Sequence, residues 1–173
     1  MERIGSKTVF EGNIARVRHD EFRYPDGSVS EREIVGHPGA VAMLAHDDLH
    51  VYLVRQPREA VGEESLLELP AGKLDVPGES ELDCAKRELA EEIGKGASEW
   101  KELKRFYTSP GFAEEKVIVY LATDLHDASA ESDEEERLEV VAWPLAELDG
   151  AIEECRDAKS LIGLLLFREL RRN

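Results

Sequence analysis

Four charged side chains lie within six consecutive residues, from Arg87 to Glu92. On a helix, Glu88 and Glu92 are four residues apart, so their carboxylates lie one above the other, with Glu91 beside them. Like charges at this spacing destabilise a helix by about 0.2–0.5 kcal/mol per pair, and a bound cation would compensate for that. Hard divalent cations, chiefly Mg²⁺, prefer such oxygen ligands. The spacing alone is equally typical of a divalent metal site and of a solvated acidic face.

A helix must carry these glutamates, and its two ends can be read from the sequence. Residues 80–83, Ser-Glu-Leu-Asp, are typical of a helix N-terminus, and Gly94 is a typical C-terminal stop. Between them, four apolar residues recur at spacings of three, four and four and form one stripe: Leu82, Ala85, Leu89 and Ile93. The sequence therefore predicts a helix over residues 80–93.

The remaining segments predict a sheet and two further helices. Runs rich in β-formers predict strands over residues 14–24, 29–37, 40–45, 50–56, 66–69, 103–107, 117–123 and 138–143. The turn residues 25–28 and 47–48 predict two hairpins. Residues 145–172 predict two helices that break near Arg156 and Asp157, and the acidic stretch 124–136 predicts a loop. These elements make a mixed α/β domain with a mixed or antiparallel sheet.

Length and charge limit the classes of partner. The chain has 173 residues, of which 42% are hydrophobic, enough for one domain with a real core. Its 38 acidic and 22 basic residues give a formal net charge of −16. This charge repels phosphate backbones and anionic membranes, so we expect neither nucleic acid nor a membrane as a partner.

Cysteine spacing and the chain's apolar segments bear on the compartment. Cys84 and Cys155 lie far apart and form no CxxC pair, which favours a reducing compartment. The first residues lack the apolar core of a signal peptide. The longest apolar run, residues 161–167, is far shorter than the ~20 residues that a membrane span needs. We expect a cytoplasmic protein.

Gly72, Glu79 and the segment from Arg87 to Gly94 together resemble the Nudix box. Its pattern is Gly, five residues, Glu, seven residues, Arg-Glu-aliphatic, any residue, Glu-Glu, any residue, Gly-aliphatic. The chain departs from it twice: six residues separate Gly72 from Glu79, and Lys95 occupies the final aliphatic position. The first departure implies a larger loop before the helix and the second a weaker packing contact after it, but neither removes a metal ligand.

Segments on both sides of the box resemble the ADP-ribose pyrophosphatase branch of the family, namely residues 32–41, 54–58, 67–72 and 109–112. That branch hydrolyses ADP-ribose to AMP and ribose 5-phosphate and usually works as a dimer with exchanged N-terminal strands. The resemblance implies an α/β (α+β) fold, a Nudix-type α/β/α sandwich with a mixed sheet. Residues 1–37 would be an N-terminal antiparallel strand extension that forms a homodimer, and residues 38–173 the hydrolase domain.

The resemblance also implies roles for the box residues. The backbone carbonyl of Ala71 and the carboxylates of Glu88 and Glu92 would bind Mg²⁺, with Mn²⁺ as the alternative. Glu91 would be a further ligand or hold a metal-bound water. Arg87 would orient the glutamates through salt bridges rather than touch the substrate.

In this branch the general base comes from a late loop just before a strand, where this chain has residues 133–140. Glu136 matches that place best, because the predicted strand begins directly after it. A shift in register leaves Glu134 and Glu135 as alternatives, and a solvated acidic loop is the simpler interpretation of the whole run. A carboxylate brought to the site would deprotonate the attacking water.

For the nucleotide-sugar substrate, Arg58 suits a phosphate because a guanidinium can bridge two oxygens. By resemblance, Arg32 is a second phosphate contact, contributed across a dimer, and Glu115 would accept hydrogen bonds from the terminal ribose. Each arginine is alternatively an ordinary surface ion pair. Three aromatic residues could stack on adenine or belong to the core: Phe22, Tyr24 and Phe112.

Two other functions stay open. One is a Nudix hydrolase of another nucleoside diphosphate sugar or of a dinucleoside polyphosphate. The other is a module that senses ADP-ribose without cleaving it. Such modules often lose box glutamates or gain a DNA-binding domain, whereas this chain keeps Glu88, Glu91 and Glu92 and has no basic domain. An enzyme is therefore favoured.

Overall fold

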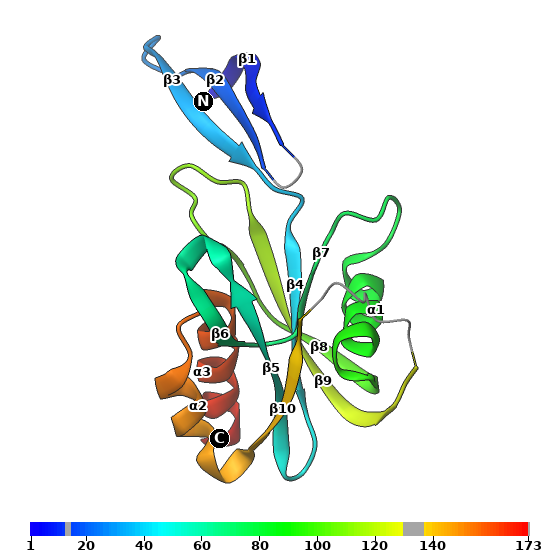
Figure 1. The fold of residues 1–173 in the computed structure, drawn as a ribbon. Helices are drawn as coiled ribbons and strands as arrows, with labels where there is room; N and C mark the ends of the chain where they lie inside the picture. Colours follow the sequence, from blue (N-terminus) through cyan, green and yellow to red (C-terminus); the bar gives the residue numbers. More distant parts are fainter. Residues whose placement is uncertain (13–14, 130–136, 173) are drawn as a thin grey trace. The chain divides into compact units, whose positions relative to one another are not determined.

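The computed structural model describes residues 1–12, 15–129 and 137–172, and the chain divides into two compact units. The N-terminal unit comprises Met1–Gly39 and Phe106–Lys116, and the second unit comprises Ala40–Arg105 and Val117–Asn173. Figure 1 traces both along the chain. The domain boundary predicted between residues 37 and 38 stays a prediction.

The N-terminal unit is built on a three-stranded antiparallel sheet of β1 (Glu2–Glu11), β2 (Arg16–Arg23) and β3 (Val29–Gly36). The predicted turn joins β2 to β3, and Gly27 there has a φ of 84°, which an L side chain adopts only with strain. Residues 106–116 attach to β3, because the Val35 N–H donates to the carbonyl of Phe112 (2.8 Å). Strand β1 was not predicted, since its residues are mostly polar and do not alternate between polar and apolar.

The second unit contains a seven-stranded mixed sheet. Its strands are β4 (Ala40–His46), β5 (His50–Arg58), β6 (Glu63–Glu68), β7 (Ala71–Lys73), β8 (Lys95–Tyr107), β9 (Lys116–Asp127) and β10 (Glu139–Pro144). The order is β10-β5-β4-β9-β8, with β6 paired to β5 and β7 to β4. Strand β4 runs parallel to β9 and antiparallel to β5 and β7, as a mixed sheet requires.

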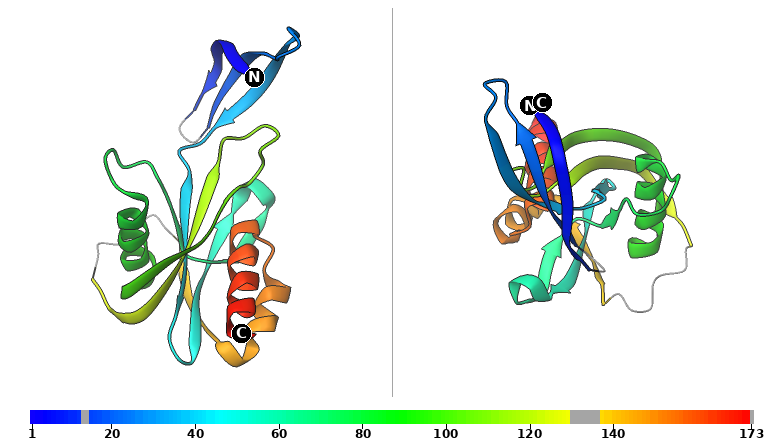
Figure 2. Two further views of the ribbon diagram at one scale, coloured as in Figure 1. Left: turned by 180° about the vertical axis from the view of Figure 1, so that it is seen from behind. Right: turned by 90° about the horizontal axis from the view of Figure 1, so that it is seen from above.

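Helices cover both faces of this sheet. Figures 1 and 2 show α1 (Glu81–Ile93) on one side and α2 (Leu148–Glu154) and α3 (Ala158–Arg172) on the other. The predicted break near residues 156–157 falls between α2 and α3. Two short 3₁₀ helices, η1 (Glu59–Val61) and η2 (Leu145–Glu147), complete the unit. The predicted α/β/α sandwich is confirmed. None of the helices within the described ranges combines the length and apolar character that crossing a membrane requires.

The core explains why the sheet is packed on both faces. Alternate residues of β4, including Val41 and Met43, pack against α1 through Ala85 and Leu89, all fully buried. On the opposite face, α3 approaches so closely that a Cβ at Gly163 would lie 2.6 Å from a methyl carbon of Leu69. Both helices are therefore held tightly against the sheet, which fixes the position of whatever they carry.

Strands β8 and β9 extend furthest beyond their predicted limits. Strand β8 begins at Lys95 rather than at 103, and β9 continues to Asp127. The predicted loop over 124–136 is therefore wrong for residues 124–127. Tertiary packing is the cause, because Trp100 of β8 and Leu125 of β9 pack against the cluster under α1. Residues 130–136 lie outside the described residues.

Candidate active site

Helix α1 begins and ends where its local sequence predicts. The Ser80 hydroxyl accepts a hydrogen bond from the Asp83 N–H (3.1 Å) at the N-terminus. At the C-terminus, Gly94 adopts a left-handed conformation with a φ of 66°, and its N–H donates to the carbonyl of Ala90. Cys84, Ala85, Leu89 and Ile93 are buried, so the box glutamates are placed by a rigid element.

Helix α1 places the carboxylates of Glu88 and Glu92 against the backbone of the short strand β7. The Ala71 N–H donates to Oε2 of Glu92 (3.1 Å). A Cβ at Gly72 would lie only 2.0 Å from the carboxyl carbon of Glu88 and 2.1 Å from its Cγ, so any larger residue would displace the Glu88 side chain. Strand β4 holds this backbone in place, because Gly72 pairs with Val41. Two acidic side chains thus converge on the backbone of two adjacent residues, Ala71 and Gly72.

Arg87 ties three glutamates together. Its Nε and Nη2 donate to the two carboxylate oxygens of Glu79 (2.9 and 3.0 Å), while Nη1 donates to Glu88 (2.9 Å) and Glu91 (2.7 Å). The hydrogen bonds with Glu79 are the main reason that the pKa of Arg87 is raised, and they lower the pKa of Glu79. These ion pairs are the contacts expected of an arginine that orients the glutamates.

The donors at β7 have the chemistry that a hard divalent cation needs. Glu88 and Glu92 provide carboxylate oxygens, Ala71 provides a carbonyl, and the missing side chain of Gly72 lets the Glu88 carboxylate approach this backbone. In the described part of the chain, no three His, Cys, Asp or Glu side chains form a group that could hold a metal ion. A cation here would therefore combine the two carboxylates with the backbone carbonyl. Glu91 contacts Arg87.

Arg58 is paired within the same unit. Its Nε and Nη2 donate to the two oxygens of Glu68 (2.6 and 2.8 Å), a carboxylate that is only 1% exposed. Burial alone would raise the pKa of Glu68, but the hydrogen bond from Arg58 and the charge of Lys159 outweigh it and lower the pKa. Arg58 is thus held in a fixed orientation, with its side chain still 42% exposed.

The other predicted substrate residues belong to the N-terminal unit. Glu115 accepts a hydrogen bond from the Thr108 hydroxyl (2.7 Å) and lies 3.6 Å from Nδ1 of His37. Arg32 is exposed and donates to the backbone carbonyl of Glu31 (2.7 Å) and, at 3.4 Å, to the hydroxyl of Tyr24.

The remaining candidates are only partly described. Phe22 and Phe112 line a pocket of about 680 Å³ in the N-terminal unit, together with Tyr107, Arg3 and Arg18. The candidate bases Glu134, Glu135 and Glu136 lie outside the described residues, so that assignment stays a prediction.

Comparison with known families decides the classification. A family model described as "NUDIX domain" matches residues 36–161, and another, described as "Nucleoside diphosphate sugar hydrolase N-terminal domain", matches residues 1–35. The chain belongs to the NUDIX family. The resemblance inferred from the box is therefore confirmed, and the acidic segment on α1 is a Nudix box.

Relatives and solved structures agree with this. The chain is 45% identical to an ADP-ribose pyrophosphatase of Mycobacterium tuberculosis, over 84% of this chain and 72% of the relative. It is 40% identical to one of Bacillus subtilis, over 91% and 86%. A crystal structure of an ADP compounds hydrolase superimposes with a TM-score of 0.86 at 30% identity, covering 99% of this chain and 94% of that one.

Lys95 shows how the chain accommodates its departure from the Nudix box. The amine of Lys95 donates to Asp127 (2.7 Å) and lies 5.8 Å from the centre of the Tyr52 ring. The position is filled by an ion pair and a cation–π contact instead of an aliphatic packing contact. Gly94, the last matched residue of the box, keeps its role as the helix stop.

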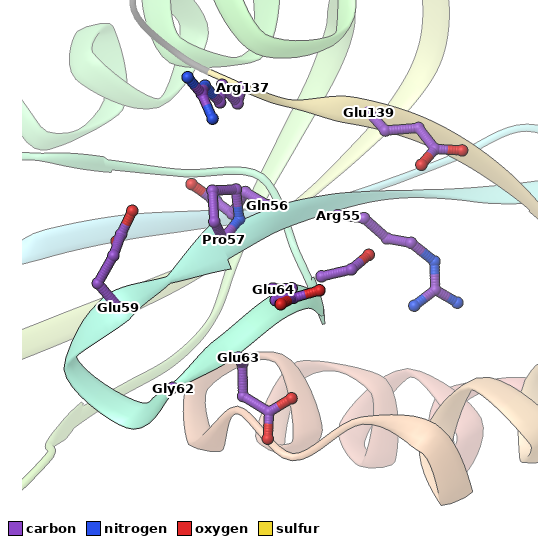
Figure 3. A pocket seen from close by; sticks show the side chains of 10 residues that line it. Arg55, Gln56, Pro57, Glu59, Gly62, Glu63, Glu64, Arg137 and Glu139 are labelled. Carbon is purple, nitrogen blue, oxygen red and sulfur yellow. The ribbon is translucent and has the colours of Figure 1, made fainter.

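Figure 3 shows a separate pocket of about 680 Å³, which the β5–β6 hairpin and the start of β10 line without any residue of the Nudix box. Its charged lining residues are Arg55, Arg137, Glu59, Glu63, Glu64 and Glu139. Four acidic groups against two basic ones make it a poor place for a diphosphate. Arg55 is already paired with Glu154. We therefore assign no part of the substrate to this pocket.

Sequence reasoning missed the residues that hold the turn before β7. Glu68 is bonded to Lys159, and the Leu69 N–H donates to the hydroxyl of Ser160 (2.7 Å). One indication was available, because Glu68 is an acidic residue inside the apolar run from Leu66 to Leu69. Nothing in the sequence pointed to Lys159 or Ser160.

Proposed function

We propose that this protein hydrolyses the pyrophosphate bond of ADP-ribose to give AMP and ribose 5-phosphate, with Mg²⁺ as its cation and Mn²⁺ as the alternative. The observation that carries the proposal is the convergence of Glu88 and Glu92 on the Ala71–Gly72 backbone within the Nudix box. The activity for which the two relatives are named supports ADP-ribose as the substrate. The similar crystal structure, that of an ADP compounds hydrolase, makes other ADP compounds the second candidate.

The box residues would hold the cation and keep one another in place. Glu88, Glu92 and the Ala71 carbonyl would bind it, and Arg87 fixes the direction of Glu88 and Glu91. Glu91, which Arg87 also contacts, would be a further ligand or hold a metal-bound water. When bound, a divalent cation supplies Lewis-acid stabilisation of the charge that develops at the diphosphate.

Residues outside the box bind the substrate and move a proton. Arg58 binds a phosphate oxygen, Arg32 binds a second phosphate oxygen from the other subunit of a dimer, and Glu115 accepts hydrogen bonds from the terminal ribose hydroxyls. Glu136 takes a proton from the attacking water. The water oxygen bonds to one phosphorus while the bond from that phosphorus to the bridging oxygen breaks, and the bridging oxygen leaves with the other phosphate.

A panel of nucleotide substrates ranked by kcat/KM in the presence of Mg²⁺ tests the proposed reaction. ADP-ribose should rank first, with AMP and ribose 5-phosphate as the products. Glu92→Gln should lower turnover about a hundredfold or more while the circular dichroism spectrum stays unchanged, because one metal-binding charge is lost. Binding of ADP-ribose without hydrolysis by the wild-type protein would favour a sensing module instead.

The N-terminal strands support a homodimer. The sheet of β1–β3 leaves Val9 and Phe10 exposed, and a second subunit would cover such residues. Light scattering at micromolar concentration should give twice the mass of one chain. A monomer with full ADP-ribose hydrolysis would rule out both the dimer and an essential Arg32 from a partner.

Cys84 and Cys155 are free and buried, which suits the cytoplasm, where we expect the protein to act.

A further inference from the structure

Glu68 lies at the centre of a cluster of four charged side chains, which also includes Arg58, Asp157 and Lys159. Besides the two hydrogen bonds from Arg58, Oε2 of Glu68 accepts one from Nζ of Lys159 (2.5 Å). The same Nζ donates to Oδ2 of Asp157 (2.8 Å). Arg58 and Lys159 carry positive charges and Glu68 and Asp157 negative ones, so the formal charges of this Glu68 cluster sum to zero.

The first turn of α3 attaches the Glu68 cluster to the Nudix box. Oδ2 of Asp157 accepts hydrogen bonds from the N–H (3.0 Å) and the hydroxyl (2.5 Å) of Ser160, and that hydroxyl accepts one from the Leu69 N–H (2.7 Å). Two residues further along, the Ala71 N–H donates to Glu92 of α1 (3.1 Å). Helices on opposite faces of the sheet therefore hold the same short segment of backbone.

Arg58 lies within electrostatic reach of the Nudix box. The hydrogen bond to Glu68 is the largest cause of the raised pKa of Arg58, and the charge of Glu92 contributes to the same increase. Glu68 uses the Nε and Nη2 side of the guanidinium, while Nη1 donates no hydrogen bond to any residue that the structure describes. Within the described residues, that group is therefore free to donate to an anion.

Lys159 determines how strongly the positive charge of Arg58 acts on a bound anion. A buried carboxylate paired with a single arginine cancels most of the arginine's field at a distance. Because Lys159 shares Glu68 and also balances Asp157, the cluster as a whole stays neutral. Without Lys159 its formal charge would be −1, and a diphosphate next to Nη1 would be repelled.

We propose that Lys159 is a positioning residue for the diphosphate of the substrate, acting through Glu68 to keep the charge of Arg58 available. The proposal rests on the proposed function, because it assumes that Arg58 contacts the diphosphate. It assigns to the C-terminal helix a part in substrate binding, although Lys159 and Glu68 are separated by 91 positions in the sequence.

The test compares Lys159→Met with the double variant Asp157→Asn/Lys159→Met in the full-length protein. Lys159→Met should raise KM for ADP-ribose about tenfold and change kcat by less than about twofold, because a field on the bound anion acts equally on ground and transition states. The double variant restores neutrality, and asparagine still caps α3. Its KM should therefore return to within about threefold of the wild-type value.

A purely structural role predicts a different pattern. In that case the double variant would bind ADP-ribose no better than Lys159→Met, and the proposal would be overturned.

Asp157→Asn alone is the second variant, used if Lys159→Met does not fold. It gives the cluster a charge of +1, so KM should fall, and an unchanged or higher KM would also overturn the proposal. Arg168→Met is the matched control, because it removes an α3 cation whose partner is the exposed Asp149 (3.2 Å), and it should leave KM unchanged.

Binding of inorganic pyrophosphate, measured by calorimetry, separates the two proposals. If the wild-type protein does not hydrolyse ADP-ribose but Lys159→Met binds pyrophosphate more weakly, the substrate is wrong and the role of Lys159 stands. If ADP-ribose is hydrolysed and Lys159→Met changes neither KM nor pyrophosphate binding, the role of Lys159 is overturned and the function stands. If the wild type neither hydrolyses ADP-ribose nor binds pyrophosphate, both fail.

Discussion

Gly72 and Glu88 are in such close contact that a methyl group at position 72 would lie 2.0 Å from the Glu88 carboxyl carbon. Gly72 does not have a positive φ. The requirement for glycine is therefore set by the side chain of Glu88 and not by the local backbone conformation. The glycine of the Nudix box is part of the proposed metal site because it allows this carboxylate to reach the backbone of β7.

Gly72→Ala should therefore inactivate the enzyme without unfolding it. The added methyl group displaces Glu88 from β7, and turnover should fall about a hundredfold, comparable to the loss of a metal ligand. Steady-state rates at several Mg²⁺ concentrations would measure this, with circular dichroism reporting the fold. Gly150→Ala is the matched control, because its new Cβ would meet only Trp143, at an ordinary 3.5 Å. Equal activity of both variants would contradict the prediction.

Arg87→Lys should lower activity although the charge is kept. The guanidinium makes hydrogen bonds to Glu79, Glu88 and Glu91 from three different nitrogens, which a single ammonium group cannot reproduce. We expect kcat to fall about tenfold, because Glu88 loses a partner that fixes its direction.

A second arginine on the same unit provides the comparison for Arg87→Lys. Nη1 and Nη2 of Arg105 donate to the two carboxylate oxygens of Glu81 in α1 (2.8 and 2.7 Å), and Nη2 also donates to Glu102. Arg105→Lys should leave kcat unchanged, since neither of these two glutamates belongs to the Nudix box. If both variants lose the same activity, the effect would be a general one on α1 and not on the carboxylates of the site.

Asp47 in the β4–β5 turn should make stability depend on pH. Burial alone would raise its pKa, but hydrogen bonds from the Tyr52 hydroxyl and the backbone N–H groups of Leu49 and His50 outweigh this and lower the pKa from 3.8 to about 2. A carboxylate with a lowered pKa in the folded state stabilises the protein above pH 3.8 and loses that contribution as the pH falls toward 2.

The corresponding measurement compares the wild type with Asp47→Asn by urea unfolding at a series of pH values. Their difference in free energy of unfolding should be largest above pH 3.8 and shrink steadily as the pH approaches 2. A difference that grows toward acid pH would show that Asp47 does not carry this contribution.

The sequence was most informative where the determinants are local. The glutamates of the box, the Ser80 cap and the Gly94 stop all lie within a short segment, so spacing alone places them on one helix. Strand β1 was missed because its residues do not alternate between polar and apolar, and its place depends on pairing with β2. Local patterns record capping and periodicity but not which distant strand completes a sheet.

The Glu68 cluster, like strand β1, could not be predicted from local sequence patterns. Arg58 was predicted from the sequence as a phosphate ligand, but the carboxylate that holds it and the lysine that shares that carboxylate were not. Lys159 reaches Glu68 only because α3 packs on the sheet close to Leu69, as the tight approach of Gly163 shows. A contact between residues so far apart in the chain follows from packing, which no spacing rule expresses.

Glu136 is the candidate general base, and its substitution should separate proton transfer from metal binding. If Glu136 deprotonates the attacking water, Glu136→Gln should lower kcat about 10²–10⁴-fold and leave Mg²⁺ affinity nearly unchanged. Glu88→Gln should weaken both, because Glu88 stands on the rigid helix that would hold the cation. Rates at saturating Mg²⁺ and Mg²⁺ titrations of each variant would distinguish these effects, with Glu134→Gln and Glu135→Gln as neighbouring controls. If a control loses activity while Glu136→Gln keeps it, the base is in this segment but at another position. If all three variants stay active, the base lies elsewhere, with Glu115 or a box glutamate the next to test.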